Sequence, residues 1–534
     1  MSDEASTLKK DVKEDRKKVL QRAFFMASGT LTSRILGLFR DMALAALFDR
    51  AVTDAWAAAF RLPNLFRRLF GEGSLSVSFI PVFLEAKDGD PHGPRVQNLV
   101  NALYTILLIA LAVVTVLGVI YMDSVLGLLL SSRYMADTEK WFLTVRMARI
   151  MFGFVFFVCT YAYFMGILNA LGVFGLPAVA PALLNISMLA FTFMPTSWFA
   201  EKGDGLAWGV LVGGVLQASL LWIALKARGF LPRLQKNIWN HDVKKVLINM
   251  VPGLLGIGLL QFSTLVNLHF ASTIGEGAIS YVYWADRLLE LPLSLVSVSL
   301  GAALLPTLSE FAFRKQKEQF QETVEEHFLF SFFLAWPAAL GLYFLAQPIV
   351  EVLFMRGHFS MDDVNATTIV LKVYALSLLF VSSIRILAPA FYAVKNTWLP
   401  AGTSLVSLLL HLSWAGWWIR QAGLQGLVLS SLLAMILQFI AMLIALHVTV
   451  MTVRWRKVSI EILKTVIAGT LLAAAVQIYE PLSALIGSSG FARMIALGIS
   501  ILLGGGVYLI SSHLLKISQG QFLISTIRRK IKIP

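Results

Sequence analysis

The sequence predicts an all-α polytopic membrane protein. Of its 534 residues, 57% are hydrophobic and only 14% are charged, and the mean hydropathy is +0.74. This composition is typical of a chain that folds within a bilayer, and it excludes a stack of soluble domains. The net charge of +14 lies mostly in short breaks between apolar segments. It therefore indicates membrane topology and gives no sign of a nucleic-acid partner.

The apolar segments predict fourteen transmembrane helices, because a helix needs about 20 mostly apolar residues to cross a bilayer. The segments cover residues 22–48, 54–85, 97–122, 141–171, 174–197, 205–226, 244–271, 277–310, 326–346, 363–394, 398–419, 424–449, 458–479 and 491–515. Lysine and arginine are concentrated at the N-terminus, in alternate loops and in the C-terminal tail. This positive-inside pattern, with an even number of helices, predicts that both termini are cytoplasmic.

A weak internal repeat predicts two lobes. Leu176-Pro177-Ala178 resembles Leu399-Pro400-Ala401 at an offset of 223 residues. An offset of six helices preserves orientation, so the lobes are expected to be parallel. We expect a basic N-terminus at 1–21, an N-lobe at 22–226, a cytoplasmic linker at 227–243, a C-lobe at 244–450, and an appended helix pair with a basic tail at 451–534.

Charged residues at membrane depth mark the candidate site. Each costs about 2.5–3.5 kcal/mol on insertion scales, so such residues persist mostly where they face a cavity or a partner. The excess of arginine among them indicates an anionic cargo. The first two predicted helices carry Arg34, Arg40, Asp41, Asp54, Arg61, Arg67, Arg68 and Glu72, and the eighth carries Asp286, Arg287 and Glu290.

Helical spacing groups part of this set. Asp54, Arg61 and Arg68 recur every seven residues and form one polar stripe. Pro63 removes a backbone hydrogen bond, so the helical phase beyond it is unreliable. A second match, Pro81–Glu85 with Pro306–Glu310, has an offset of 225 residues, and at that offset Asp286 corresponds to Arg61. This predicts that both lobes turn charge toward a shared central cleft. An internal ion-pair network, or arginines that extend to an interface, remain the alternatives.

The motifs of soluble enzymes are absent from the sequence. There is no GxxxxGK[ST] phosphate loop, and the eight histidines show no metal-ligand spacing. We therefore predict a transporter with no catalytic residue, no metal site and no evident cofactor, and the coupling ion is not identified. The single cysteine, Cys159, lies in an apolar run and is expected to be a small buried hydrophobe.

Several blocks of the sequence resemble the MurJ (MviN) lipid II flippase family. They read SRILGLFRD at 33–41, FRLPNLFRRLFGEG at 60–73, and YWADRLLELP at 283–292. The resemblance extends over nearly the whole chain. It implies the multidrug/oligosaccharidyl-lipid/polysaccharide exporter superfamily, with two six-helix lobes and two extra helices. It also implies movement of undecaprenyl-pyrophosphate-linked peptidoglycan precursor (lipid II) from the inner to the outer leaflet of the bacterial cytoplasmic membrane, in cell wall biogenesis.

The resemblance also implies a set of site residues. By motif position, substrate binding falls on Arg34, Arg40, Asp54, Arg67, Ser280 and Arg287. The supporting charges are Asp41, Arg61, Arg68, Glu72, Asp286 and Glu290. Helical phase alone favours Arg68 for the cavity, whereas the family motif favours Arg67. The implied partners are lipid II, membrane lipids and the cell-wall synthesis machinery.

Other functions remain open at the level of sequence. The nearest is a flippase for another lipid-linked oligosaccharide. A cation-coupled drug exporter on the same fold would favour an acidic site, against the arginine excess. A membrane-embedded glycosyltransferase would need catalytic carboxylates near an outer loop, and the predicted outer loops are short. A non-transporting scaffold would bind the lipid without moving it.

Overall fold

The computed structural model describes residues 32–70, 75–87, 93–294, 299–487 and 489–531. The basic N-terminus predicted at 1–21 and the first residues of the first predicted span lie outside these ranges. The described residues form helices and no strands, which confirms the all-α prediction. The chain divides into two compact units, residues 1–273 and 274–534, and each is described by itself.

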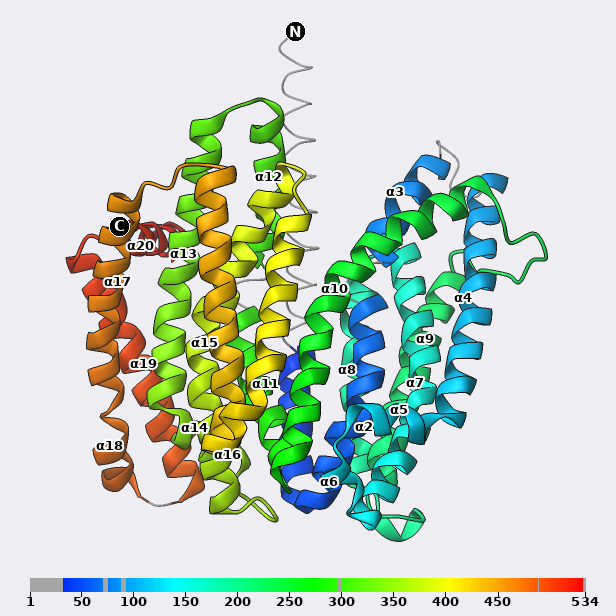
Figure 1. Ribbon diagram of the computed structural model, residues 1–534, viewed down its shortest axis with the longest axis horizontal. Coiled ribbons are helices and arrows are strands. Elements are labelled where there is room, and N and C mark those ends of the chain that lie inside the picture. Colours follow the sequence, from blue (N-terminus) through cyan, green and yellow to red (C-terminus); the bar gives the residue numbers. More distant parts are fainter. Residues whose placement is uncertain (1–31, 71–74, 88–92, 295–298, 488, 532–534) are drawn as a thin grey trace. The chain divides into compact units, whose positions relative to one another are not determined.

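The first unit is built around one long buried helix, α7 (Figure 1). This helix packs against α2, α3, α4 and α9, and Tyr163 on it donates a hydrogen bond of 2.7 Å to the Val100 carbonyl of α4. The helices of the unit are residues 32–47, α2 (Arg50–Leu69), α3 (Leu75–Lys87), α4 (Pro94–Ile120), α5 (Met122–Leu129), α6 (Ser132–Met135), α7 (Thr138–Ala170), α8 (Gly175–Thr192), α9 (Asp204–Lys226) and α10 (His241–Ile274).

The segment predicted as a linker, 227–243, is anchored to α4 of the first unit. The backbone N–H of Arg233 donates to Asn101 Oδ1 at 2.7 Å, and that of Gln235 donates to Thr105 Oγ1 at 3.1 Å. Arg95, at the start of α4, forms two hydrogen bonds of 2.9 and 2.8 Å with the Asp242 carboxylate. These bonds lower the pKa of that carboxyl below its usual range. The segment therefore runs along α4, and its contacts hold the start of α10 against the first unit.

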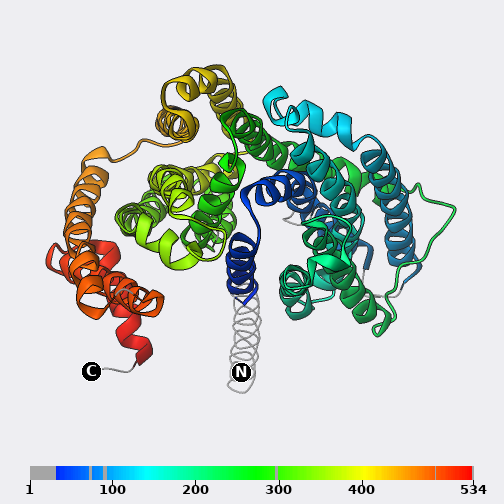
Figure 2. The same cartoon turned by 90° about the horizontal axis from the view of Figure 1, so that it is seen from below.

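The second unit repeats this plan around α15, which packs against α11, α12, α13, α14 and α16. Ser360 and Asp363 form a capping box that starts α15. The helices are α11 (Ala278–Leu293), α12 (Ser299–Phe313), α13 (Lys317–Phe344), α14 (Ala346–Phe354), α15 (Met361–Ala393), α16 (Trp398–Thr449), α17 (Trp455–Val476), α18 (Tyr479–Ile486), α19 (Gly490–Leu514) and α20 (Ser518–Ile531). Helices α17 and α19 pack together and lie side by side in Figures 1 and 2.

The long range of α16 contains two antiparallel segments. The backbone leaves helical geometry at Ala422 and Gly423, and Gly423 has φ +53°. Ser430 Oγ lies 3.0 Å from His411 Nδ1, and Gln438 Nε2 donates a hydrogen bond of 2.9 Å to Ser404 Oγ. Both pairs are nearly centred on residue 421, as in a hairpin. The predicted break between 398–419 and 424–449 is therefore confirmed.

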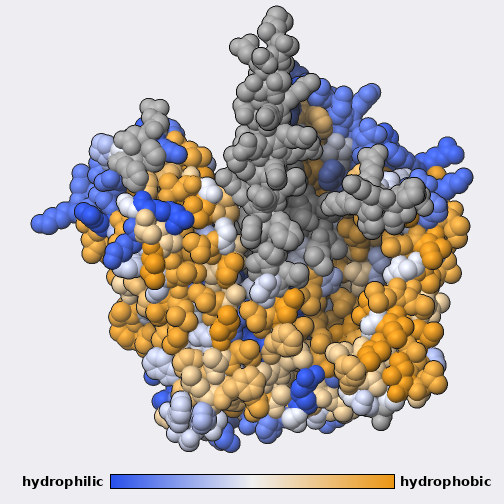
Figure 3. Space-filling view, turned by 180° about the vertical axis from the view of Figure 1, so that it is seen from behind, coloured by the Kyte–Doolittle hydropathy of each residue, from blue (hydrophilic) through white to orange (hydrophobic). Residues whose placement is uncertain are grey.

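The predicted number of spans is not confirmed. Within the described ranges, nine helices are long and apolar enough to cross a membrane, with α16 counted once. The predicted span 54–85 comprises α2 and α3, with 71–74 outside the described residues, and the predicted span 277–310 comprises α11 and α12. On the face in Figure 3, each unit carries a broad band of apolar side chains with hydrophilic residues toward the helix ends. This distribution fits a membrane-embedded protein.

Candidate functional site

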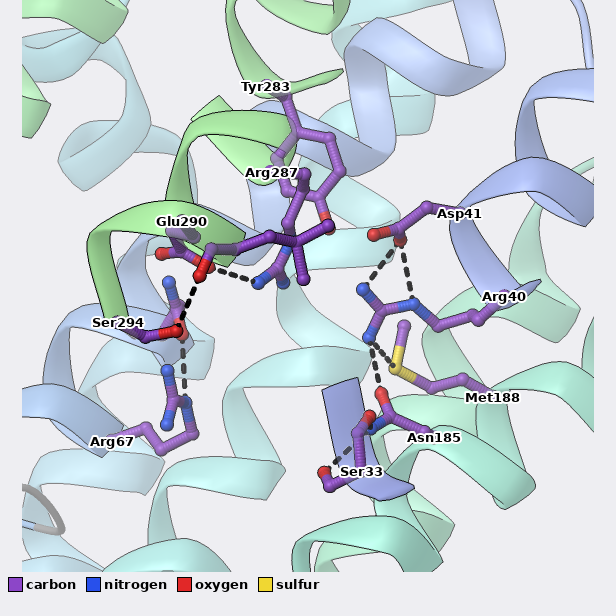
Figure 4. Close-up of polar contacts among 12 residues, drawn as sticks. Ser33, Arg40, Asp41, Arg67, Asn185, Met188, Tyr283, Arg287, Glu290 and Ser294 are labelled. Carbon is purple, nitrogen blue, oxygen red and sulfur yellow. Dashed lines mark hydrogen bonds and ion pairs between the residues drawn. The ribbon is translucent and has the colours of Figure 1, made fainter. Parts of the chain in front are cut away.

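Arg40 is buried within the first unit and is held by polar partners. Only 3% of it is exposed. Its Nε and Nη2 donate to Asp41 Oδ1 at 2.8 and 2.5 Å, and its Nη1 donates to Asn185 Oδ1 at 2.9 Å (Figure 4). A buried charge is tolerated when it is paired and hydrogen-bonded in this way. In this conformation the Arg40 guanidinium therefore supports the first described helix.

Asn185 of α8 holds that helix at two points. Besides accepting from Arg40, it donates through Nδ2 to the Ser33 carbonyl at 2.8 Å and to Ser33 Oγ at 3.1 Å. Ser33 and Arg40 are two turns apart, and a Cβ added at Gly37 between them would lie 3.6 Å from Asn185 Oδ1. Asn185 thus spans the turn that carries Arg34. Asn185 was not predicted as a site residue, although it is a lone amide among the apolar residues of α8, which is a signal of a specific contact.

Arg34 is half-buried on this same helix, in contrast to Arg40. Its orientation depends on the rotation of the helix about its own axis. The bonds from Asn185 to Ser33 and Arg40 fix that rotation. Arg34 is therefore a partly exposed cation on a firmly held support.

The charges of α2 differ in burial along the helix. Asp54 is fully buried, whereas Arg61, Arg67 and Arg68 are only partly buried. Arg67 donates through Nε to Asn64 Oδ1, one turn earlier, at 2.9 Å. The Nε of Arg61 is buried and has no hydrogen-bond partner among the described residues. Partial burial does not distinguish Arg67 from Arg68, and Glu72 lies outside the described residues.

In the second unit, α11 carries the other charged group. Arg287 donates through Nη1 to Glu290 Oε2 at 2.9 Å and through Nε to the hydroxyl of Tyr283 at 3.0 Å (Figure 4). Its guanidinium carbon also lies 5.2 Å from the centre of the Tyr283 ring, within cation–π range. About a quarter of the Arg287 side chain remains exposed. Tyr283 was not predicted as a site residue, although its spacing of four residues from Arg287 on a helix indicates that the two side chains can meet.

The remaining predicted residues of α11 are Ser280 and Asp286. Ser280 is 2% exposed and Asp286 is half-buried. The start of this helix is fixed to α15, because Tyr281 donates to Asp363 Oδ1 at 2.7 Å. Asp363 also caps α15 through Ser360. Like the helix at 32–47, α11 therefore presents a partly exposed arginine from a backbone held by buried polar contacts.

The described side chains contain no group of three or more His, Cys, Asp or Glu residues placed to hold a metal ion. His411 is buried and hydrogen-bonded to Ser430. The Nδ1 atom of His269 lies 3.2 Å from the carbonyl oxygen of Leu129. Cys159 is 1% exposed, which agrees with its predicted role as a buried hydrophobe.

Comparison with known sequences establishes the family. The family model described as lipid II flippase MurJ matches residues 10–498. The chain belongs to the lipid II flippase MurJ family. The resemblance seen in its motifs is thereby confirmed, and so is its assignment as a multi-pass membrane transporter, not an enzyme.

Two curated members of the MurJ family illustrate the similarity. The chain is 60% identical over 529 residues to the probable lipid II flippase MurJ of Bdellovibrio bacteriovorus, an alignment that covers 99% of both proteins. It is 36% identical over 397 residues to the lipid II flippase MurJ of Burkholderia cenocepacia, with 73% of this chain and 77% of that protein covered. The similarity to the first relative extends over essentially the full length.

Solved structures share the MurJ fold. A lipid II flippase MurJ in an inward closed conformation matches with a TM-score of 0.76 and 22% identity, over 96% of this chain and all of the other. An inward-facing MATE family multidrug transporter of the MOP superfamily matches with a TM-score of 0.64 and 16% identity, over 79% of this chain and 97% of the other. At these identities the likeness concerns the fold alone, and it confirms the predicted fold class.

Proposed function

We propose that this chain moves lipid II from the inner to the outer leaflet of the bacterial cytoplasmic membrane by alternating access. The observation that carries the proposal beyond family membership is that each unit has a partly exposed arginine on a helix held by buried polar contacts. These are Arg34, beside the Asn185 contacts, and Arg287, beside Tyr283 and Glu290. A diphosphate offers several anionic oxygens, and guanidinium supplies planar, permanently charged donors for them.

The proposed site residues divide into two groups by burial. Three of the arginines, Arg34, Arg67 and Arg287, are partly exposed. Their side chains can therefore contact a bound headgroup without a rearrangement of the helices that carry them. Arg40, Asp54 and Ser280 are buried, and we assign them to the support of the binding helices in this conformation. Contact between Arg40 and the diphosphate would require exchange of its bonds to Asp41 and Asn185.

The orientation and partners follow from the same proposal. Both termini lie in the cytoplasm, because the lysine and arginine of the sequence are concentrated at the ends and in alternate loops. Such an orientation would let the chain take its substrate from the side on which the basic loops lie. The cell-wall synthesis machinery is the proposed further partner, and crosslinking in cells followed by purification of this chain tests that contact.

Alanine and lysine variants of the arginines test the site. Arg34→Ala and Arg287→Ala should each weaken lipid II binding about tenfold or more, because each removes a charge-assisted contact to the diphosphate. Arg34→Lys should retain only part of the affinity, since lysine keeps the charge but loses the bidentate geometry. Binding is measured on the purified full chain, and lipid II exposure is measured in cells that contain only the variant.

Arg356→Ala is the matched control, because Arg356 is an exposed arginine whose Nη2 donates to the Val352 carbonyl of its own segment. It should bind and flip normally. If Arg287 served only to neutralise Glu290, Arg287→Ala would lower thermal stability while the folded protein bound lipid II normally. Normal binding and flipping by well-folded Arg34→Ala and Arg287→Ala proteins would refute the proposed site.

A further inference from the structure

A second candidate binding site lies within the first unit, where α7 begins. It is a cavity of about 410 Å³ between α5, α7 and α9. This volume lies within the range of small-molecule sites, about 300–1,000 Å³. Its wall combines charged and aromatic side chains, namely Asp123, Trp141, Phe142, Arg146, Arg149 and Trp208.

The length of α7 indicates that the cavity lies near the level where lipid headgroups meet the hydrocarbon core. Helix α7 has 33 residues, which corresponds to about 50 Å, whereas the hydrocarbon core is about 30 Å thick. The helix therefore extends beyond the core, and the lining residues from Trp141 to Ile150 occupy its first turns. Tryptophan is enriched at this interface because its ring is apolar and its N–H is polar.

The charges that line or back the cavity are balanced. Arg146 forms bonds of 2.9, 3.1 and 2.9 Å with the carboxylate of Asp204, which is itself 2% exposed. Arg149 pairs with Asp123, and both of these side chains are about half exposed. An exposed pair contributes little to stability, so its members can exchange partners at small cost. Arg149 can therefore bind an external anionic group, and Asp123 can bind an external cationic group.

An apolar track leaves the cavity along α9. Trp208, Leu216 and Ile223 are exposed by 42, 42 and 60%, and their spacing places them on one side of the helix. In a membrane protein such a stripe faces acyl chains. A molecule with a charged head in the cavity and a hydrocarbon chain could therefore occupy both surfaces together.

We propose that this cavity binds the headgroup of a zwitterionic phospholipid. The phosphate accepts hydrogen bonds from Arg149, the ammonium group lies against Asp123 and the faces of Trp141 and Trp208, and an acyl chain follows α9. The balance of two arginines and two aspartates favours a headgroup that carries one charge of each sign over a net anionic one. This site is separate from the arginines of the proposed transport function and does not depend on them.

Native mass spectrometry of the purified full chain tests this proposal, with phosphatidylethanolamine as the zwitterionic probe, phosphatidylglycerol as the anionic probe and inorganic phosphate as a competitor. One phosphatidylethanolamine should bind in preference to phosphatidylglycerol. Arg149→Gln should lower its affinity about tenfold through loss of a charge-assisted bond. Asp123→Asn should weaken phosphatidylethanolamine but strengthen phosphatidylglycerol, because Arg149 then lacks a neutralising carboxylate.

Arg356→Gln, an exposed arginine elsewhere, is the control and should change neither affinity. Arg149→Gln and Asp123→Asn alter half-exposed side chains, so both proteins should keep their thermal stability. Trp208→Leu changes no charge and should also weaken lipid binding. Equal affinity for the two lipids, unchanged binding by Arg149→Gln and Trp208→Leu, or displacement of the lipid by inorganic phosphate would each overturn the proposal.

Discussion

At the scale of single residues, the buried guanidinium of Arg40 depends on a partner far away in sequence. Asp41 neutralises it from the adjacent position, and Asn185 on α8 accepts a hydrogen bond from its Nη1. An arginine buried to this degree would be costly without both contacts. The stability of the first described helix and the direction of Arg34 are therefore coupled through one amide side chain.

Replacement of that amide is predicted to affect both folding and binding. Asn185→Ala removes one acceptor from Arg40 and two contacts to Ser33, which should lower the free energy of unfolding by about 1–3 kcal/mol. It should also weaken lipid II binding, because Arg34 loses its fixed direction. Thermal stability and lipid II affinity are measured on the same preparation. Asn396→Ala, which removes only a cap bond of 3.2 Å to the Leu399 N–H, is the control; equal effects of the two variants would contradict the coupling.

The sequence could reveal the charged residues but not all their partners. Arg34 and Arg287 could be predicted as site residues because charge at membrane depth is rare. The family motif contains the same two positions. The pairing of Arg287 with Glu290 was an open alternative, and the contact at 2.9 Å shows that it forms. Asn185 could not be connected to Ser33 and Arg40 from periodicity, since 145 residues separate it from Arg40 and only tertiary packing joins them.

At the scale of the elements, the long helices follow the apolar segments closely. The break at Ala422 and Gly423 falls inside the predicted gap between two spans. The short helices α5, α14 and α18 were not predicted, because a search for segments of about 20 apolar residues passes over them. The two halves share element lengths as well: α7 and α15 each have 33 residues, and both their first and last residues are 223 positions apart.

Helix α9 gives the topology a direct test. It has 23 residues, enough to cross the hydrocarbon core, with exposed lysines beyond each end at Lys202 and Lys236. In a Cys159→Ala background, Lys202→Cys should react with an impermeant thiol reagent from outside the cell, and Lys236→Cys only after the membrane is opened. The Cys159→Ala protein alone should not react. Reaction of both cysteines from the same side would exclude the proposed orientation.

At the scale of the whole molecule, packing and sequence divide the chain at different places. By the repeat offset, α10 corresponds to the first helix and so belongs to the second half of the sequence. By packing, most of it belongs to the first unit, where Asp242 pairs with Arg95 and Ser272 bonds to Ser131. The repeat could be predicted from short motifs. The packing of α10 could not, because it depends on contacts between residues more than 140 positions apart.

Transport by this chain is tested most directly by determining the leaflet in which lipid II resides. Cells that rely on this chain as their lipid II flippase are depleted of it, and externally accessible lipid II is then quantified. If the chain moves lipid II, outer-leaflet lipid II should fall as the chain is lost while total lipid II is maintained or rises, and re-expression should restore exposure. Continued exposure of lipid II at the normal rate after depletion, with no other flippase present, would contradict it.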